Sequence, residues 1–428
     1  MKIKKVFKNA GILASGDFFA AILGFISFGI IGRTLGTSNL GVFSVIITYV
    51  TLIDKFVNFQ SWQALIKYGS KLSFVNDKHN YNKLFSFGLF IDIASAILAF
   101  LISIILCTYL SSFFKWDNNT LNLIKIYSIV ILFNIEGTPT AIFRIDNKYL
   151  FFTKRAKITS IIKMLLFVIC CSYSLKIDYF IYSTLLAQAL GSIYFVSKAL
   201  NYTNLNPLPF FKKSNIKYVL KRNPRILNFL IISNIQTSLK LSTTLVDTLL
   251  VNKFLGNSAT GLFQVVKQFT KVFSLISSPL YKSIYPELTS LWESNNTKEF
   301  KVLIINGVKY GTLISFATYF LFAIFGKYII GIYIGPEFVE SYFIMLYYFL
   351  GVVILVSTFP FSPAILAMGF PKIPLKITFI SSLSFITSFF LLYEKFNHLT
   401  IGISYLITSI VWLIFNFYFF KTKLKQLI

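Results

Sequence analysis

The chain has 428 residues, of which 56% are hydrophobic and 13% charged, and its mean hydropathy is +0.71. This composition excludes an ordinary soluble globular protein, because apolar runs of about 20 residues, each long enough to cross a bilayer as a helix, recur from end to end. The 41 Lys and Arg against 15 Asp and Glu give a formal net charge of +26, which would suit either a nucleic-acid partner or a membrane surface.

Continuous apolar runs favour membrane-spanning helices over a barrel, whose strands would alternate polar and apolar residues over about ten positions. The N-terminal sequence MKIKKVFKNAG resembles the n-region of a signal peptide, but the following apolar run is long and lacks an A-x-A site, so we expect a retained first helix. We predict an all-α polytopic membrane protein. Its twelve predicted spans are residues 10–33, 40–62, 85–108, 121–143, 157–175, 179–198, 228–251, 259–284, 302–326, 341–368, 374–394 and 400–420.

The connection between the first two spans has a second copy later in the chain. Residues 35–43 and 255–263 both read L-G-x-S-x-x-G-[VL]-F, each between two apolar runs. Six predicted spans separate the copies, and because six is even, both copies have the same orientation in the membrane. We therefore predict a parallel repeat, with a six-helix lobe at 1–198, a basic cytoplasmic linker at 199–227 and a second six-helix lobe at 228–428.

The positive charge is distributed as a topology signal. Alternate connections are strongly basic, whereas each connection on the other side has about one basic residue. The basic clusters lie at 2–8, 67–83, 144–157, 198–225, 282–301, 372–376 and 421–425. This pattern predicts that both termini are cytoplasmic, and a nucleic-acid partner is not needed to explain the charge.

Ionisable residues of the second half fall inside predicted spans. Lys240 and Asp247 share a face of the seventh span, and Lys267 and Lys271 lie one turn apart in the eighth. A charge near the bilayer centre costs about 2.5–3.5 kcal/mol on insertion scales, so such residues usually face a cavity or a partner. Two lysines one turn apart repel each other, which predicts an anionic ligand; packing between helices is the alternative for Lys240 and Asp247.

The first half carries acids instead. Asp17, Asp54, Asp92 and Glu136 lie in the first four spans, toward the cytoplasmic part of the membrane on the predicted topology. A carboxyl group there can relay protons or accept hydrogen bonds between helices. Both interpretations remain open at this point.

Three segments carry a resemblance to a known family. Residues 32–43 contain R-x-L-G-x-x-x-x-G-x-F, residues 54–69 resemble the end of that family's second helix, and residues 247–263, with Tyr285-Pro286-Glu287 beyond them, form the third. In these segments the chain resembles the polysaccharide-exporter branch of the multidrug/oligosaccharidyl-lipid/polysaccharide (MOP) superfamily, and it is particularly similar to Wzx-type O-antigen flippases. The resemblance extends over nearly the whole chain.

The resemblance implies two MATE-like lobes around a central cavity in the bacterial inner membrane. It implies alternating access that moves an undecaprenyl-diphosphate-linked oligosaccharide, an O-antigen or capsule repeat unit, to the periplasmic leaflet. Asp247 matches a recurrent family position; Lys240, Lys267 and Lys271 are added from this sequence as diphosphate-binding residues. We expect no cofactor, and coupling to a proton or sodium gradient through Asp17, Asp54, Asp92 or Glu136. Besides membrane lipids, a polysaccharide polymerase and chain-length proteins are expected partners.

The same residues also discriminate between a flippase and other classes of membrane protein. A drug antiporter of the same superfamily is the first alternative, although an exporter of cationic drugs should line its cavity with acids and aromatic rings rather than lysines. A membrane polymerase or glycosyltransferase needs a catalytic cluster in a sizeable external loop, and the predicted external loops do not exceed roughly 15 residues. We therefore expect a transporter.

Overall fold

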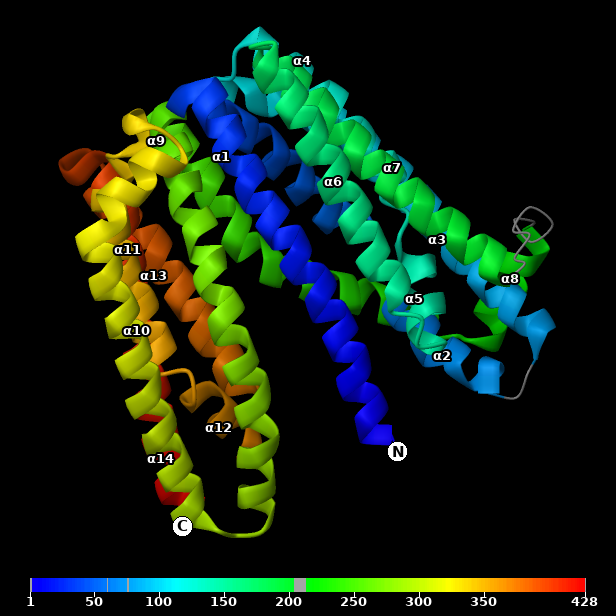
Figure 1. Ribbon diagram of the computed structural model, residues 1–428. Coiled ribbons are helices and arrows are strands. Elements are labelled where there is room, and N and C mark those ends of the chain that lie inside the picture. The colour runs from blue at the N-terminus through cyan, green and yellow to red at the C-terminus, as the bar shows by residue number, and fades with distance from the viewer. Residues whose placement is uncertain (1, 60, 75–76, 204–212, 428) are drawn as a thin grey trace. The chain divides into compact units, whose positions relative to one another are not determined.

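The computed structural model describes residues 2–59, 61–74, 77–203 and 213–427 (Figure 1). Within these ranges it gives no side-chain description for 2–10, 71, 73–74, 213–214, 236–244, 272–283 and 425–427. Every regular element among the described residues is a helix, which confirms the all-α prediction.

The helices follow the predicted spans with few departures. Short 3₁₀ helices interrupt or connect them at η1 (Ser128–Phe133), η3 (Pro336–Phe338) and η4 (Asn397–Leu399). The α-helices are α1 (Lys2–Val57), α2 (Trp62–Phe74), α3 (Lys78–Phe114), α4 (Asn118–Tyr127), α5 (Gly137–Ile145), α6 (Leu150–Ser172), α7 (Ile177–Thr203), α8 (Lys213–Arg222), α9 (Ile226–Glu293), α10 (Thr297–Tyr333), α11 (Ser341–Ser357), α12 (Phe361–Ala367), α13 (Lys372–Phe396) and α14 (Thr400–Leu427).

Two of the helices each contain two predicted spans. α1, of 56 residues, and α9, of 68 residues, both bend at a glycine. The fourth and tenth spans are instead broken in two, as α4–η1–α5 and α11–α12. Seven stretches of the described residues are long and apolar enough to cross a membrane. The chain is a multi-span, all-helical membrane protein.

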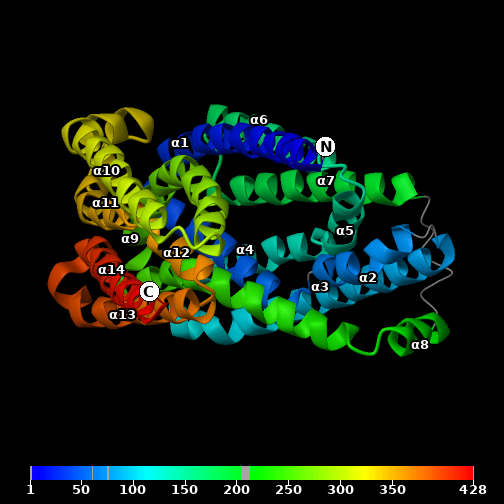
Figure 2. The same cartoon turned by 90° about the horizontal axis from the view of Figure 1, so that it is seen from below.

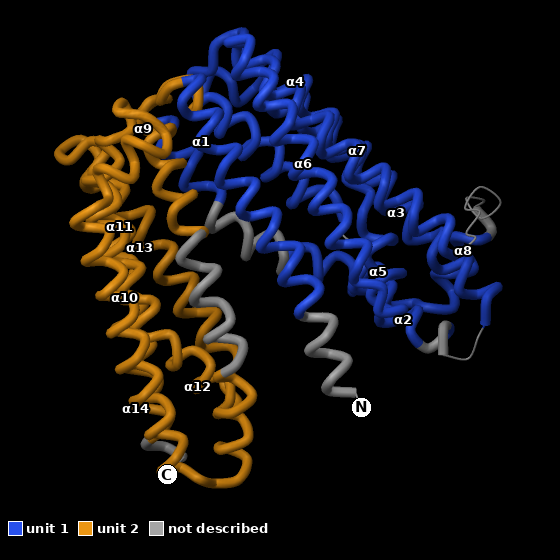
Figure 3. The backbone as a smooth tube through the Cα atoms, in the orientation of Figure 1, with its two compact units in different colours: residues 1–35, 42–253 blue, residues 36–41, 254–428 orange. Residues whose placement is uncertain are grey.

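The chain divides into two compact units (Figure 3). Unit 1 comprises residues 1–35 and 42–253, and unit 2 comprises residues 36–41 and 254–428. Residues 226–253 of α9 therefore belong to unit 1, and the turn at residues 36–41 within α1 belongs to unit 2. These units are defined by contacts and not by the repeat, so the predicted lobes 1–198 and 228–428 stay a prediction.

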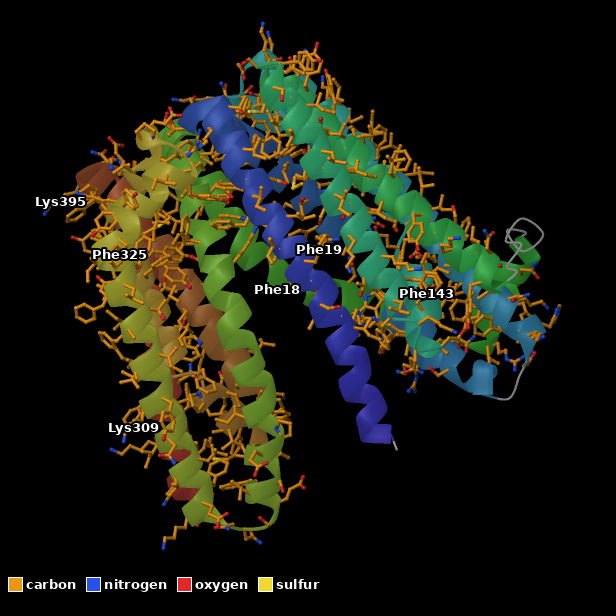
Figure 4. The ribbon with its side chains drawn as sticks, viewed as in Figure 1. Phe18, Phe19, Phe143, Lys309, Phe325 and Lys395 are labelled. Carbon is orange, nitrogen blue, oxygen red and sulfur yellow. The ribbon has the colours of Figure 1, made fainter. Side chains whose placement is uncertain are left out.

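Unit 1 packs its helices around a cluster of buried aromatic rings. Phe143 of α5 is fully buried, stacks on Phe151 of α6 at 4.4 Å between ring centroids, and lies 5.2 Å from the ring of Phe195 of α7 (Figure 4). Such large rings bury much apolar area and fix the relative position of the helices that carry them. α8 packs its apolar residue Val219 onto the same cluster.

Unit 2 is a bundle in which α10 lies beside α11, and α14 lies beside both α11 and α13 (Figure 2). Tyr348 of α11 and Tyr405 of α14 stack with their ring centroids 3.6 Å apart. On α10 the apolar residues Leu313, Ile324 and Phe325 are more than half exposed; Phe325 is labelled in Figure 4. An exposed apolar helix face is expected where a helix meets lipid.

The repeated segments adopt the same backbone turn. Gly36 has φ 72° and ψ 177°, and Gly256 has φ 82° and ψ −174°. Positive φ of this kind is accessible to glycine without the clash that a Cβ causes. The repeat identified from sequence therefore corresponds to a repeated geometry, in which the two long helices each change direction between a Leu and the following polar residues.

The two repeat copies also pack on each other within unit 2. A Cβ on Gly41 would lie 1.9 Å from the carbonyl oxygen of Asn257, and a Cβ on Gly261 would lie 2.0 Å from that of Thr37. Thr37 and Asn257 hold the same position in the motif, as do Gly41 and Gly261. The contact is therefore reciprocal, and it requires glycine on both sides.

Candidate functional site

Two membrane-spanning segments of unit 1 are discontinuous. α1 ends at Val57 and α2 begins at Trp62, while η1 ends at Phe133 and α5 begins at Gly137. Backbone that leaves the helix at membrane depth needs partners for its amide and carbonyl groups, so it occurs only inside protein or beside a polar cavity. These two breaks therefore mark a candidate site.

The breaks are joined by side-chain amides and a carboxylate. The Asn58 side chain donates to Asp54 Oδ1 at 2.9 Å and to the backbone carbonyl of Asn134 at 3.1 Å. The Asn134 side chain donates to Asp54 Oδ2 at 3.3 Å. Ser95 of α3 donates to the Asn58 oxygen at 3.0 Å. Asp54, buried to 3% exposure, thus binds the second break to the first.

Asp92 of α3 holds the starts of two helices. Its Oδ2 accepts from the backbone amide and from the hydroxyl of Thr138, both at 2.7 Å, at the start of α5. Its Oδ1 accepts from the backbone amide of Ser61, just before α2, at 3.4 Å. A carboxylate at a helix start satisfies amides without intrahelical partners and opposes the positive end of the helix dipole.

A cavity of about 280 Å³ lies beside these breaks, within unit 1. α1, α6 and α7 contribute to its wall together with the segment from Tyr127 to Glu136. Its lining residues are Val50, Thr51, Asp54, Lys55, Tyr127, Val130, Asn134, Glu136, Arg155, Thr159 and Gln188.

The charged residues of this cavity are paired. Lys55 Nζ lies 3.2 Å from Asp54 Oδ2, and the Arg155 guanidinium is paired with the Glu136 carboxylate. Ser192 of α7 also donates to Glu136, at 2.7 Å. Charged groups held within a membrane-spanning segment are costly unless they are paired or serve a ligand. The cavity can offer hydrogen-bond donors and acceptors to a polar group inside a membrane protein.

A family model described as "Polysaccharide biosynthesis protein" matches residues 30–343, which include the repeat, the breaks and the cavity. The chain belongs to this family. Its relatives include the inner membrane protein YghQ of Escherichia coli (strain K12), which is 24% identical over 349 residues, covering 79% of this chain and 95% of YghQ.

Solved structures resemble this polysaccharide biosynthesis protein in fold. An inward-facing multidrug resistance MATE transporter of the MOP superfamily superposes with a TM-score of 0.75 at 11% identity, covering 95% of this chain and 96% of that one. The lipid II flippase MurJ, in an inward closed conformation, superposes with a TM-score of 0.72 at 17% identity, covering 96% and 87%. The MATE-like, transporter-type fold predicted from the sequence is thereby confirmed.

The four predicted acids have different surroundings in the fold. Asp54 and Glu136 line the cavity, which brings them to one site. Asp92 is buried next to the breaks, where it holds helix starts, and it is not among the lining residues. Asp17 is exposed on α1, apart from that lining. The hydrogen bonds of Asp92 favour the interpretation that it joins helices.

The predicted lysines lie on α9. Lys267 is half-buried, with its Nζ 4.7 Å from the centroid of the Phe263 ring, and Lys271 is exposed one turn later. The side chain of Lys240 lies outside the described residues. Asp247 is half-buried and accepts from the backbone amide of Thr248 at 2.6 Å. Asp247 belongs to unit 1 and the pair Lys267 and Lys271 to unit 2, so a shared site for them stays a prediction.

Several lining residues were not predicted from the sequence. Arg155 falls in a basic cluster that was assigned to topology, yet it pairs with Glu136. Asn134 and Gln188 were not selected, and Tyr127 donates to Gln188 Oε1 at 3.1 Å. Amide side chains inside apolar runs are a sequence signal that could have found Asn134 and Gln188, because amides are costly there without partners.

Proposed function

We propose that this chain is a Wzx-type flippase, which moves an undecaprenyl-diphosphate-linked oligosaccharide, an O-antigen or capsule repeat unit, from the cytoplasmic to the periplasmic leaflet by alternating access. Membership of the polysaccharide biosynthesis family and a MATE-like fold support a transporter that serves glycan assembly. The fold it shares with MurJ, itself a lipid II flippase, makes a lipid-linked substrate the preferred choice.

The observation that carries this proposal is the charged cavity beside the broken helices of unit 1. Broken helices near ionisable groups mark substrate and ion sites in transporters, because the freed backbone groups and helix ends are available to ligands. Most of the described residues that line the cavity are polar. A substrate with a hydrophilic head and a lipid tail needs such an environment for its head only.

In this proposal the lysines of α9 receive the diphosphate. Lys240, Lys267 and Lys271, with Asp247 on the same helix, are the proposed substrate-binding residues. Charge-assisted contacts to phosphate are strong away from water, and two like charges one turn apart are relieved by an anion. Asp54 and Glu136, and beyond the cavity Asp17 and Asp92, are the proposed groups for coupling to a proton or sodium gradient.

The proposed location is the bacterial inner membrane with both termini cytoplasmic. The inner-membrane relative YghQ supports the membrane assignment, and the alternation of basic connections supports the orientation. A polysaccharide polymerase and chain-length proteins, which would act on the delivered repeat units, are the proposed partners besides the lipid-linked substrate.

The test is the leaflet in which lipid-linked oligosaccharide resides. A deletion strain is radiolabelled, converted to spheroplasts and treated with an impermeant glycosidase. We expect lipid-linked units to accumulate in a shielded form, and the wild-type gene to restore cleavage. The double variant Lys267→Gln/Lys271→Gln should fail to restore it at equal expression, whereas Lys309→Gln, which changes an exposed lysine of α10 (Figure 4), should succeed.

Unchanged exposure in the deletion strain, with no second flippase present, would overturn the proposal. The superfamily's other transport mode, export of small molecules, then becomes the leading function, and it is tested by efflux of a compound panel. Restoration of exposure by the double variant would remove the diphosphate role of Lys267 and Lys271 but leave the flippase proposal standing.

A further inference from the structure

The cavity of unit 1 has a chemistry that the diphosphate role does not explain. Eleven of the described residues line it, of which nine are polar and the two others are Val50 and Val130. Its volume of about 280 Å³ is near the lower end of the range typical of small-molecule pockets, about 300–1,000 Å³, so it suits a small polar ligand such as one pyranose ring.

The charges of the cavity cancel. Lys55 is paired with Asp54 and Arg155 with Glu136, so the lining formed by the described residues carries equal numbers of acids and bases. A diphosphate, with about two negative charges, gains most where cations are in excess, and a bare metal cation gains most among oxygen ligands without ammonium groups beside them. A formally neutral lining favours a neutral polar ligand over either ion.

The lining provides donors and acceptors side by side. The carboxylates of Asp54 and Glu136 accept, and the Lys55 ammonium and Arg155 guanidinium donate. Gln188 accepts from Tyr127 through its oxygen, so its amide nitrogen supplies two further donors. A sugar hydroxyl is at once a donor and an acceptor, so a ring carrying several hydroxyls uses both kinds of group.

The partners of the cavity are also held in place by the fold. Asp54 is fixed by Asn58 and Asn134, and Glu136 is fixed by Ser192 and Arg155. Groups whose positions are fixed beforehand lose little entropy when a ligand binds, which makes weak hydrogen bonds effective. The side chains of Lys55 and Arg155 line the cavity and retain 29% and 33% exposure, so pairing does not bury them completely.

We infer that the cavity of unit 1 binds one neutral sugar residue through its hydroxyl groups. This inference rests on the proposed function in one respect, namely that the sugar belongs to the transported oligosaccharide. The site would then recognise the glycan separately from the diphosphate, and residues such as Thr51, Thr159 and Gln188 would determine which sugars are accepted.

The test measures protection of a cysteine placed in the cavity of the full-length purified protein. Thr51→Cys is introduced with Cys171→Ser, because Cys171 is exposed whereas Cys107 and Cys170 are buried. Maleimide labelling is followed with rising galactose, glucose or N-acetylglucosamine, and with inorganic pyrophosphate or sodium chloride at matched ionic strength. The sugars are expected to slow labelling saturably, with recovery on their removal, and the two salts to leave it unchanged.

Two controls separate occupancy of the cavity from general effects. Native Cys171 in the otherwise unchanged chain should label at the same rate with and without sugar. Gln188→Leu added to the Thr51→Cys protein should raise the half-protecting sugar concentration about tenfold, the loss expected for one or two hydrogen bonds. Gln63→Leu, on α2 and outside the cavity lining, should not.

Protection by pyrophosphate without protection by sugars would overturn the inference in favour of an anion site. Protection by sodium would overturn it in favour of the cation-coupling role proposed above for Asp54 and Glu136, with which the sugar site competes. Absence of protection by all three sugars, both at Thr51→Cys on α1 and at Thr159→Cys on α6, would also overturn it. The leaflet assay reports on the flippase proposal independently, so either proposal can fail while the other stands.

Discussion

The two copies of the repeated segment share a backbone conformation, whereas the helices that follow them differ in chemistry. Their motifs turn at Gly36 and Gly256 with nearly the same φ and ψ, and Gly41 and Gly261 meet each other's segments reciprocally. Helices α3 and α10 both have 37 residues. When their sequences are aligned from the first residue of each helix, Gly88 corresponds to Gly307. In the same sequence alignment, Asp92 of α3 corresponds to Gly311 of α10.

The difference at this position extends to the helix breaks. In the first half Asp92 accepts hydrogen bonds from the start of α5, and Asn134 lies in a polar break. In the second half a Cβ on Gly311 would lie 2.8 Å from the carbonyl oxygen of Val356, and the break between α11 and α12 contains Phe359 and Pro360. A repeated fold thus needs the same turns and close approaches, whereas the groups beside a break are free to become polar in one half only.

The largest effect is expected at the shared feature. Gly41→Ala and Gly261→Ala should each lower the free energy of unfolding by about 3 kcal/mol, the upper part of the usual range for overpacking, because the atom in the way is backbone and cannot rotate aside. Thermal unfolding in detergent measures this. Gly24→Ala is the matched control, since nothing lies within 4 Å of its Cβ position, and it should be neutral or stabilising by up to ~1 kcal/mol.

If Gly41→Ala and Gly261→Ala both melted at the same temperature as wild type, the reciprocal contact between the two repeat copies would not form in the folded protein. If only one of the two variants did so, the contact would be asymmetric, and the two repeat copies would not be equivalent there.

The next effect belongs to the first half alone. Asp92→Ala should destabilise the protein by about 2 kcal/mol, because the amides of Thr138 and Ser61 lose their acceptor inside a membrane protein. Asp92→Asn keeps one acceptor oxygen and should recover about half of the loss. Chemical denaturation monitored by tryptophan fluorescence separates the two. Equal stability of Asp92→Ala and wild type would contradict the helix-joining role.

A smaller effect on stability, with a larger one on function, is expected at the breaks. Asn134→Leu removes the amide donor to Asp54 and should reduce transport about tenfold while lowering stability by about 1 kcal/mol. Phe359→Leu, at the apolar break of the second half, should change transport little. The leaflet assay and expression level are read together for both. Equal loss of transport in the two variants would mean that the polar character of the first break has no special role.

The smallest effect tests an asymmetry between the turns. Both carboxylate oxygens of Glu337 lie close to the turn in α1, within 3.4 Å of a Cβ built on Gly36, whereas nothing lies within 4 Å of such an atom on Gly256. Glu337→Gln should cost about 0.5 kcal/mol, typical of a carboxylate near a helix start. Glu340→Gln, also exposed, is the control and should have no measurable effect in the same thermal assay. A larger loss at Glu340 would reverse this assignment.

Much of the fold followed from periodicity and run length. Apolar runs located the membrane-spanning segments from α1 to α14, and the repeated L-G-x-S-x-x-G located both turns, because only glycine tolerates the required φ at positions 36 and 256. The break before α5 was not predicted. A local signal for it was present, because Asn134, Glu136, Gly137 and Pro139 interrupt the apolar run at this point. The partners that stabilise the break, Asp92 and Asp54, come from other helices.

The candidate site was predicted in part. The acids of the first half were singled out because an ionisable group in an apolar run needs a partner, and Asp54 and Glu136 do line one cavity. Their partners were not predicted. Arg155 lies in a basic cluster that was assigned to topology, and Lys55 lies in the last turn of α1, where a lysine side chain can also reach lipid headgroups.

By itself, the sequence determined that this chain is an all-helical membrane protein with an internal repeat, because hydropathy, run length and glycine chemistry are local properties. Only the tertiary structure decided that Asp92 joins two helix starts while Asp54 and Glu136 face a cavity with paired cations. The helical period tells which residues share a face, but the neighbour of that face is set by packing between segments far apart in the chain.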